Sequence, residues 1–484
     1  MPSLREVQIR YALHFVDVLT EAQRLYRDGG ESAQAALELF DLEWSNIQKG
    51  REYAALYAGE DDVAAAACGD YADIGAHLLD LRLAPRARVE WLNASLAAAD
   101  RLKDVAAMCR HLNSLGLAYK SLGDPRRALV AHESQLAASR MLGDEHTVAA
   151  ALSNLGVAYA SMNDNDRAIS YYEEALAIFR RLGSEREQAQ MLNGLGLARS
   201  ERSEMRRAVE HFEEALAISR RLRDRRGEAN AYLNLGTTHY HLGELQRAAA
   251  RYREALAAFR EIGYRHGEGA ALGNLGLVYV PLGDVPGAIK CHEQSLEIAR
   301  SIGDRHGELE TLGTLAVAYV FVGDPQRIKE LAEEMLELAR EAKERRSEGI
   351  ALDNLGLAHR LLKDYDRAAE FHQQALAIFG EVGYARGEAN TLCSLGDIYL
   401  ESGVYVRAVE FYERGLIAAR AAELHTDIGG TLVNLAGALW ELGERAAAVA
   451  RAEEGLAALE QSGNVAAETA RALLSEWRDA MAAS

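Results

Sequence analysis

Hydrophobic residues recur along this chain at the spacing of amphipathic helices. Leu152, Leu155 and Tyr159, for example, stand three and four positions apart, and residues with this spacing lie on one face of a helix. Only six prolines occur among 484 residues, and long stretches consist of Ala, Leu, Glu and Arg, which are strong helix formers. The pattern predicts an all-α protein.

The helical pattern repeats every 40 residues from about residue 104 to residue 460. One column of the repeat holds a small residue: Gly116, Gly156, Gly196, Gly236, Gly276, Ala316, Gly356, Gly396 and Ala436. Twelve residues later, a column from Ala128 to Ala448 is alanine except at Ile328, and a further column from Leu136 to Leu456 is leucine throughout. Glycine inside a helix costs up to about 1 kcal/mol relative to alanine. Its recurrence indicates a close helix–helix contact, in which we expect the alanine column to be the packing partner.

Gly-Asp pairs follow the first helix of a unit, as at Gly123-Asp124, Gly283-Asp284 and Gly323-Asp324. Glycine ends a helix in the left-handed conformation, and aspartate caps the next helix through its side chain. Pro125 and Pro325 then stand at the first helical position, where a missing N–H does no harm. Each unit is therefore predicted to be a helix, a tight turn and a second helix.

The spacing of one set of residues resembles the tetratricopeptide repeat (TPR) and recurs in nearly every unit: Leu152, Leu155-Gly156, Tyr159, Ala168, Tyr172 and Ala175. The unit of this chain has 40 residues and no proline at the end of its second helix. The common repeat has about 34 residues. This longer unit resembles the subclass found in Pins-type spindle-orientation adaptors and in the sensor arms of STAND signalling NTPases. The resemblance implies a right-handed α-solenoid of about ten TPR helix pairs, with N-terminal helices and a C-terminal capping helix.

The repeat register divides the chain into three segments. Residues 1–60 form an N-terminal helical segment outside the register, which resembles the segment that joins the NTPase core to its repeats in STAND proteins. Residues 61–462 hold ten repeats of about 40 residues, the first of them degenerate, with Pro85 opening its second helix. Residues 463–484 are expected to form a final helix that covers the last open face, as the end of a repeat array requires.

The chain carries a net charge of −19, from 73 acidic and 54 basic residues. An acidic surface repels phosphate backbones and anionic lipids, so we expect neither nucleic acid nor a membrane as partner. The acidity either keeps a long helical protein soluble or favours a basic or apolar ligand. Four distant cysteines (Cys68, Cys109, Cys291 and Cys393) are expected to be buried thiols in a reducing compartment. With no signal peptide and no apolar run of membrane-spanning length, the sequence predicts a cytoplasmic protein.

No motif in the chain indicates catalysis, a metal or a cofactor. A Gly-x-x-x-x-Gly-Lys-Ser/Thr loop is missing. His132-Glu133 and His292-Glu293 begin like a zinc-protease motif but lack its second histidine, and they share the aromatic column of Tyr172. We therefore interpret both histidines as packing residues. A column of arginines from Arg127 to Arg407 is either a structural link at the start of the second helix or a ladder of ligand contacts.

Five asparagines occupy one position of the first helix, two residues before the small-residue column: Asn154, Asn234, Asn274, Asn354 and Asn434. In a stack of helix pairs, the first helices line the inner wall, and this position faces inward. Asparagine offers both a donor and an acceptor, which suits the backbone of an extended peptide. The TPR resemblance implies that these asparagines hold a ligand backbone, whereas the alternative is that they bond the helix of the neighbouring repeat.

The sixth and seventh repeats place hydrophobic residues on the same wall: Leu277, Val280, Val317, Val320 and Phe321. They form either a hydrophobic patch for a partner or core between repeats. Neighbouring repeats offer Tyr240 and Arg360 at equivalent positions.

These features predict a non-catalytic scaffold that binds a peptide or a partner protein in a concave groove. The alternative is a ligand-responsive sensor arm or regulator, of the STAND or peptide-pheromone-receptor type. The identity of the partner and the oligomeric state do not follow from the sequence.

Overall fold

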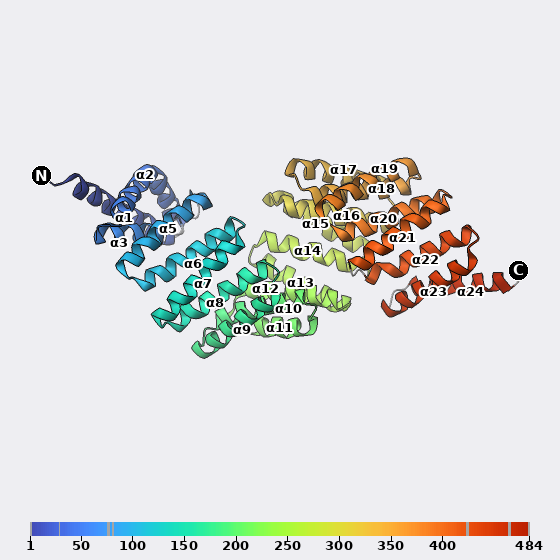
Figure 1. The fold of residues 1–484 in the computed structure, drawn as a ribbon, viewed down its shortest axis with the longest axis horizontal. Coiled ribbons are helices and arrows are strands. Elements are labelled where there is room, and N and C mark those ends of the chain that lie inside the picture. Colours follow the sequence, from blue (N-terminus) through green and yellow to red (C-terminus); the bar gives the residue numbers. More distant parts are fainter. Residues whose placement is uncertain are drawn as a thin grey trace. The chain divides into compact units, whose positions relative to one another are not determined.

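A computed structural model describes residues 2–28, 30–74, 78–79, 82–422, 425–462 and 466–482. These residues form helices joined by short turns, with no strand among them (Figure 1). The chain divides into two compact units, Met1–Leu242 and Gly243–Ser484. The prediction of an all-α solenoid of helix pairs is confirmed.

The first unit contains the N-terminal helices and the first repeats. Its helices are α1 (Leu4–Asp28), α2 (Gly30–Tyr57), α3 (Asp62–Ile74), α5 (Pro85–Leu102), α6 (Val105–Ser121), α7 (Pro125–Leu142), α8 (Glu145–Ser161), α9 (Asn165–Leu182), α10 (Glu185–Glu201), α11 (Met205–Leu222) and α12 (Arg225–His241). Part of the degenerate first repeat, at residues 75–77 and 80–81, lies outside the described residues.

The second unit continues the array. Its helices are α13 (Leu245–Glu261), α14 (Arg265–Tyr279), α15 (Val285–Ile302), α16 (Arg305–Val322), α17 (Pro325–Ala342), α18 (Arg345–Leu361), α19 (Tyr365–Val382), α20 (Ala385–Glu401), α21 (Tyr405–Ala421), α22 (His425–Glu441), α23 (Arg445–Ser462) and α24 (Ala466–Ala482). From α6 onward, the first helix of each pair begins 40 residues after the previous one, so the sequence period is the structural period.

The turns have the predicted chemistry. Gly123 and Gly323 adopt left-handed backbone angles, with φ of 70° and 74°. The Asp124 carboxylate accepts a hydrogen bond from the Arg127 amide at 3.0 Å and so caps α7. Asp324 caps α17 in the same way. Since the caps satisfy amides that have no partner inside the helix, they fix where each second helix starts.

In six of the helix pairs, the glycine of the small-residue column lies under a ring from the second helix. The side chain sixteen residues after the glycine packs onto it, as Tyr172 does on Gly156 and Tyr412 on Gly396. A Cβ at Gly156 would lie 2.5 Å from the Tyr172 ring. The ring, rather than the alanine expected twelve residues on, therefore supplies the atoms nearest to the missing Cβ.

Two repeats have alanine at both positions, in place of the glycine and in place of the ring. Where the ring is replaced by Ala332 or Ala452, the small column holds Ala316 or Ala436, and all four alanines are buried. A Cβ is tolerated on the first helix only where the second helix presents no ring. His132, His292 and His372 occupy the ring position in three other repeats and are almost fully buried, so the interpretation of His132 and His292 as packing residues is confirmed.

At three junctions between successive pairs in the second unit, a buried glutamate is held between two arginines. Glu308 on α16, which is 5% exposed, lies 3.0 Å from Arg300 at the end of α15 and 2.9 Å from Arg305. Glu268 and Glu348 have the same arrangement. Burial raises the pKa of Glu348, but hydrogen bonds and charge from Arg340 and Arg345 outweigh it and hold the pKa below its ordinary value. The three glutamates thus link one second helix to the next first helix.

Helices outside the clear repeats cover the two ends of the array. Near the N-terminus, the Tyr71 hydroxyl donates to the Ala12 carbonyl at 2.7 Å and ties α3 to α1. Near the C-terminus, Trp477 on α24 stacks on Trp440 with ring centroids 4.6 Å apart. These contacts agree with the capping helix expected within residues 463–484, of which 463–465, 483 and 484 lie outside the described residues.

The contact of glycine and ring predicts non-additive mutations. Gly156→Ala should lower the free energy of unfolding by about 1–3 kcal/mol because the new Cβ overlaps Tyr172, and Tyr172→Ala should cost about 3–5 kcal/mol. The double variant reproduces the Ala316–Ala332 composition, so its loss should fall short of the sum by more than about 1 kcal/mol. Urea unfolding of the three variants measures this coupling. Simple additivity would contradict the contact.

The buried histidines predict sensitivity to acid. Burial lowers the pKa of His292 from 6.5 to about 4. The unfolded chain therefore binds the proton first, and this stability is complete above pH 6.5 and lost as the pH falls towards 4. The loss amounts to about 3 kcal/mol.

His292→Phe places in this repeat the ring that Phe212 supplies in another, and it should remove that part of the pH dependence. Denaturant unfolding at pH 7, 6 and 5 compares the two proteins. If both lose stability equally, the buried neutral histidine is not the cause.

Candidate functional site

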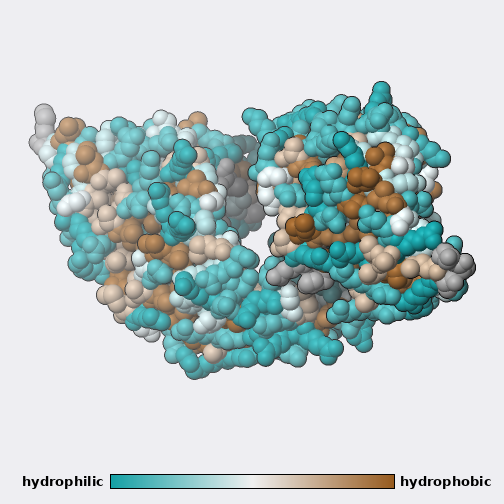
Figure 2. Space-filling model, turned by 45° about the vertical axis from the view of Figure 1, so that its right-hand side comes forward, coloured by the Kyte–Doolittle hydropathy of each residue, from teal (hydrophilic) through white to brown (hydrophobic). Residues whose placement is uncertain are grey.

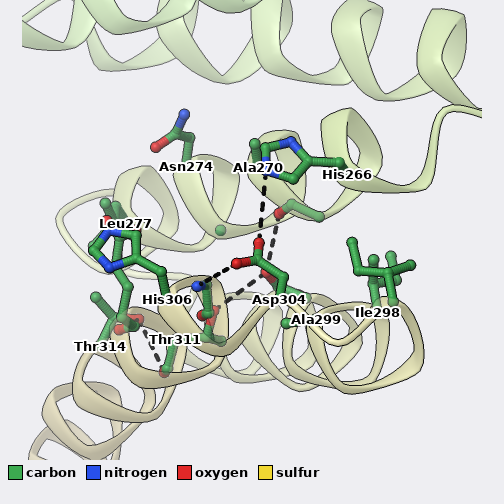
Figure 3. A pocket seen from close by; sticks show the side chains of 16 residues that line it. His266, Ala270, Asn274, Leu277, Ile298, Ala299, Asp304, His306, Thr311 and Thr314 are labelled. Carbon is green, nitrogen blue, oxygen red and sulfur yellow. Dashed lines mark hydrogen bonds and ion pairs between the residues drawn. The ribbon is translucent and has the colours of Figure 1, made fainter. Parts of the chain in front are cut away.

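A cavity of about 340 Å³ lies in the second unit between the first helices α14 and α16, next to the second helix α15 (Figure 3). Its floor is formed by Ser295, Ile298, Ala299 and Ile302 of α15. Asn274 and Leu277 line one side, and Thr311 and Thr314 line the other. The cavity thus combines an apolar floor with polar walls, as ligand sites commonly do.

Two glycines four residues apart create the hollow. Gly269 and Gly273 lie on the face of α14 that meets α15. A Cβ at Gly269 would lie 3.3 Å from Ile298, and one at Gly273 would lie 3.6 Å from Ser295. The missing side chains leave space without opening the helix contact at Gly276, where a Cβ would meet the His292 ring.

The polar groups of the floor are paired with one another. Ser295 Oγ donates to the Gly269 carbonyl at 3.0 Å and lies 3.4 Å from Thr311 Oγ1. Thr311 in turn donates to the Gly307 carbonyl at 2.7 Å. Since these hydroxyls are already satisfied, the floor offers shape and apolar contact to a ligand.

The rim carries the charge. Asp304 caps α16 through the Gly307 amide and lies 3.6 Å from His266 Nε2 across the hollow (Figure 3). His306 lies 3.7 Å from Glu344. Glu310 is exposed. None of the lining residues, all of which lie in the described part of the chain, is lysine or arginine.

The hydrophobic residues predicted on this wall divide into two groups. Val317 and Phe321 of α16 are 47% and 63% exposed, and Leu277 is 37% exposed. Val320 is half-buried and packs against the core of its repeat, and Val280 is half-buried at the end of α14. Exposed hydrophobic side chains of this kind gather in patches on an otherwise hydrophilic surface (Figure 2). Val320 is therefore part of the core of its repeat, whereas partner binding by the exposed residues stays a prediction.

The five predicted asparagines are not brought together in one site. Asn274 lines the cavity, and Asn234 lines a separate hollow of about 270 Å³ in the first unit. Asn154 donates to Asn113 of the preceding repeat at 2.7 Å, and Asn434 donates to Asp397 at 3.2 Å. Asn354 is 6% exposed. Bonding to a neighbouring repeat thus accounts for Asn154 and Asn434, and the ligand role stays a prediction for all five.

Tyr240 and Arg360 also lie apart. Tyr240 is 37% exposed at the end of α12 and meets His241 edge to face. Arg360 is held by Glu401 at 2.6 Å and lies 3.8 Å from Asp397. Its charge is neutralised inside the wall.

The arginine column is a structural link where the structure shows its contacts. Arg167 lies 3.4 Å from the capping residue Asp164 and over the Tyr159 ring at 5.3 Å. Arg127 repeats the arrangement with Asp124 and Tyr119. In these repeats the cation–π contact joins the start of the second helix to the end of the first.

No group of three or more His, Cys, Asp or Glu residues in the described ranges is placed to hold a metal ion. Within the same ranges, no helix is both long and apolar enough to cross a membrane.

The repeat geometry agrees with comparison to known families. The tetratricopeptide repeat family model matches residues 107–181, 187–261, 268–341, 323–381 and 347–421, which together span more than half of the chain. The chain therefore belongs to the tetratricopeptide repeat family. No curated protein matches it in sequence.

Solved structures share the fold at low sequence identity. A STAND protein with a tetratricopeptide repeat sensor from Pyrococcus horikoshii is 14% identical, with a TM-score of 0.53, over 81% of this chain and 68% of that one. The apo quorum sensor NprR from B. thuringiensis is 13% identical, with a TM-score of 0.50, over 78% of this chain and all of that one. At these identities the likeness shows the fold alone.

The two kinds of glycine on α14 predict opposite effects of one substitution. Gly273→Ala should raise the free energy of unfolding by about 0.5–1 kcal/mol, because alanine favours the helix and its Cβ finds ordinary contact at 3.6 Å. Gly276→Ala should lower it by about 1–3 kcal/mol, because its Cβ would lie 2.6 Å from His292. Thermal and urea unfolding measure both. Equal effects would show that the hollow at Gly273 is not a free space.

Proposed function

We propose that this protein is a non-catalytic scaffold that binds an extended peptide segment of a partner along the inner wall of its second unit. The observation that carries the proposal is the cavity between α14 and α16, next to the exposed side chains of Leu277, Val317 and Phe321. A hollow with an apolar floor beside exposed hydrophobic residues suits a segment that buries one or two side chains.

The construction of the repeat supports this location. Residues that hold the helices together, such as Gly276 with His292 and Glu308 with its arginines, are buried away from the wall. Asn274 lies beside the hollow with a side chain that can meet a peptide backbone as donor and acceptor. The wall can therefore bind a ligand without disturbing the contacts that keep the repeats stacked.

Selection of peptides tests the proposal. A random peptide library displayed on phage is panned against the full chain and against Gly273→Leu, which fills the hollow. Gly380→Leu is the matched control, since it makes the same change at an exposed position of α19. Circular dichroism and thermal melting verify that all three proteins are folded.

We expect peptides that bind the native chain and Gly380→Leu and bind Gly273→Leu at least about tenfold more weakly, the effect of losing roughly 1.4 kcal/mol. Peptides that bind all three proteins equally would place binding elsewhere. If no peptide is enriched, the proposal is wrong. The sensor-arm alternative adds that binding changes the shape of the chain, which small-angle scattering with a selected peptide measures.

A further inference from the structure

The inner wall of the second unit carries several carboxylates, and most are neutralised by neighbours. Asp353 accepts hydrogen bonds from His372 at 2.7 Å and from Thr391 at 2.8 Å. Glu401 pairs with Arg360, and Asp397 accepts from the Tyr412 hydroxyl at 2.7 Å. These groups are part of the fold and offer little charge to a ligand.

Glu310 differs from these carboxylates. It lies on α16 at the rim of the cavity and is exposed. Across the described part of the chain, no ion pair or side-chain hydrogen bond is made by its carboxylate. Asp304 shares the rim, and no lysine or arginine lines the cavity. Asp304 already caps α16 and lies 3.6 Å from His266, so Glu310 is the carboxylate that the rim offers to a ligand.

The same face of α16 becomes apolar towards its end. Glu310, Thr314, Val317 and Phe321 are spaced four, three and four residues apart, so they lie in one line along the helix. At about 1.5 Å per residue, Val317 lies about 10 Å and Phe321 about 16 Å from Glu310 along the axis. An extended peptide covers these distances in about three and five residues.

We propose, resting on the proposed function, that this wall binds an extended peptide segment. The segment places a lysine or arginine next to the Glu310 side chain and carries an aliphatic or aromatic residue three to five positions away. The basic side chain pairs with the exposed carboxylate. The hydrophobic side chain lies against Val317 and Phe321, and a small apolar side chain between the two fills the hollow at Gly273. The net charge of −19 favours the approach of such a segment.

Defined peptide pools test the charge preference. Fluorescein-labelled, C-terminally amidated nine-residue pools carry one fixed residue (lysine, norleucine or glutamate) with leucine four positions later. Binding to the full chain is followed by fluorescence anisotropy at low and high salt. The variants are Glu310→Gln, which removes the charge at nearly constant shape, and Glu297→Gln, which makes the same change at an exposed position of α15 that does not line the cavity.

We expect the native chain to prefer lysine pools over norleucine pools and to bind glutamate pools least. Glu310→Gln should weaken lysine pools by roughly three- to fivefold, as expected for one exposed ion pair, and leave norleucine pools unchanged. The lysine preference should fall at high salt. Glu297→Gln should have no such effect.

The outcomes separate this inference from the proposed function. If pools bind and Gly273→Leu abolishes binding, but lysine is not preferred or both glutamine variants act alike, the basic ligand is wrong while the groove stands. If no pool binds any of the proteins, both are wrong.

Discussion

The structure depends on the contact between a ring on the second helix and a glycine on the first. It brings the two helices of a repeat so close that a Cβ on the first helix would lie 2.5 Å from Tyr172 or 2.6 Å from Tyr412. Each ring needs a glycine sixteen residues before it. The number of residues between the two helices of a repeat is therefore fixed, and so is the length of the turn that joins them. The repeats with Ala316 and Ala436 keep the rule by losing the ring. One steric constraint thus explains why the glycine column persists despite its cost of up to about 1 kcal/mol in a helix.

The constraint also frees the inner wall. Contacts within a repeat use the buried face of each first helix, and contacts between repeats in the second unit use carboxylates such as Glu308, held by Arg300 and Arg305. Positions on the inner wall are then free to differ between repeats. On α14 and α16 these positions hold Gly273, Glu310 and Phe321, which supply a hollow, a charge and an apolar surface. Elsewhere on the wall they hold Asp353 and Arg360, which are bonded to His372 and Glu401 of the same chain.

The sequence predicted the fold well because the repeat displays each packing rule many times. The 40-residue period, the glycine turns and the aspartate caps could be read directly, and the structure confirms them. The partner of the glycine was misassigned to the alanine column, although Ala316 with Ala332 and Ala436 with Ala452 already showed the ring rule in the sequence. The sequence predicted no cavity, although two of its lining residues, Asn274 and Leu277, were among the predicted binding residues. Gly269 and Gly273 were a signal in the sequence that space is left on this face of α14. The roles of Ser295 and Glu310 could not be predicted, because they depend on which neighbouring groups bond to them in the folded structure.

A crystal structure of the full chain with a selected lysine-containing peptide would test the central claim most directly. The account predicts that the peptide lies along α16, with its basic side chain at Glu310 and an apolar side chain in the hollow between Gly273 and Ser295, and with each ring still packed on its glycine. A peptide bound to the outer helices, or a hollow left empty beside a bound peptide, would contradict it.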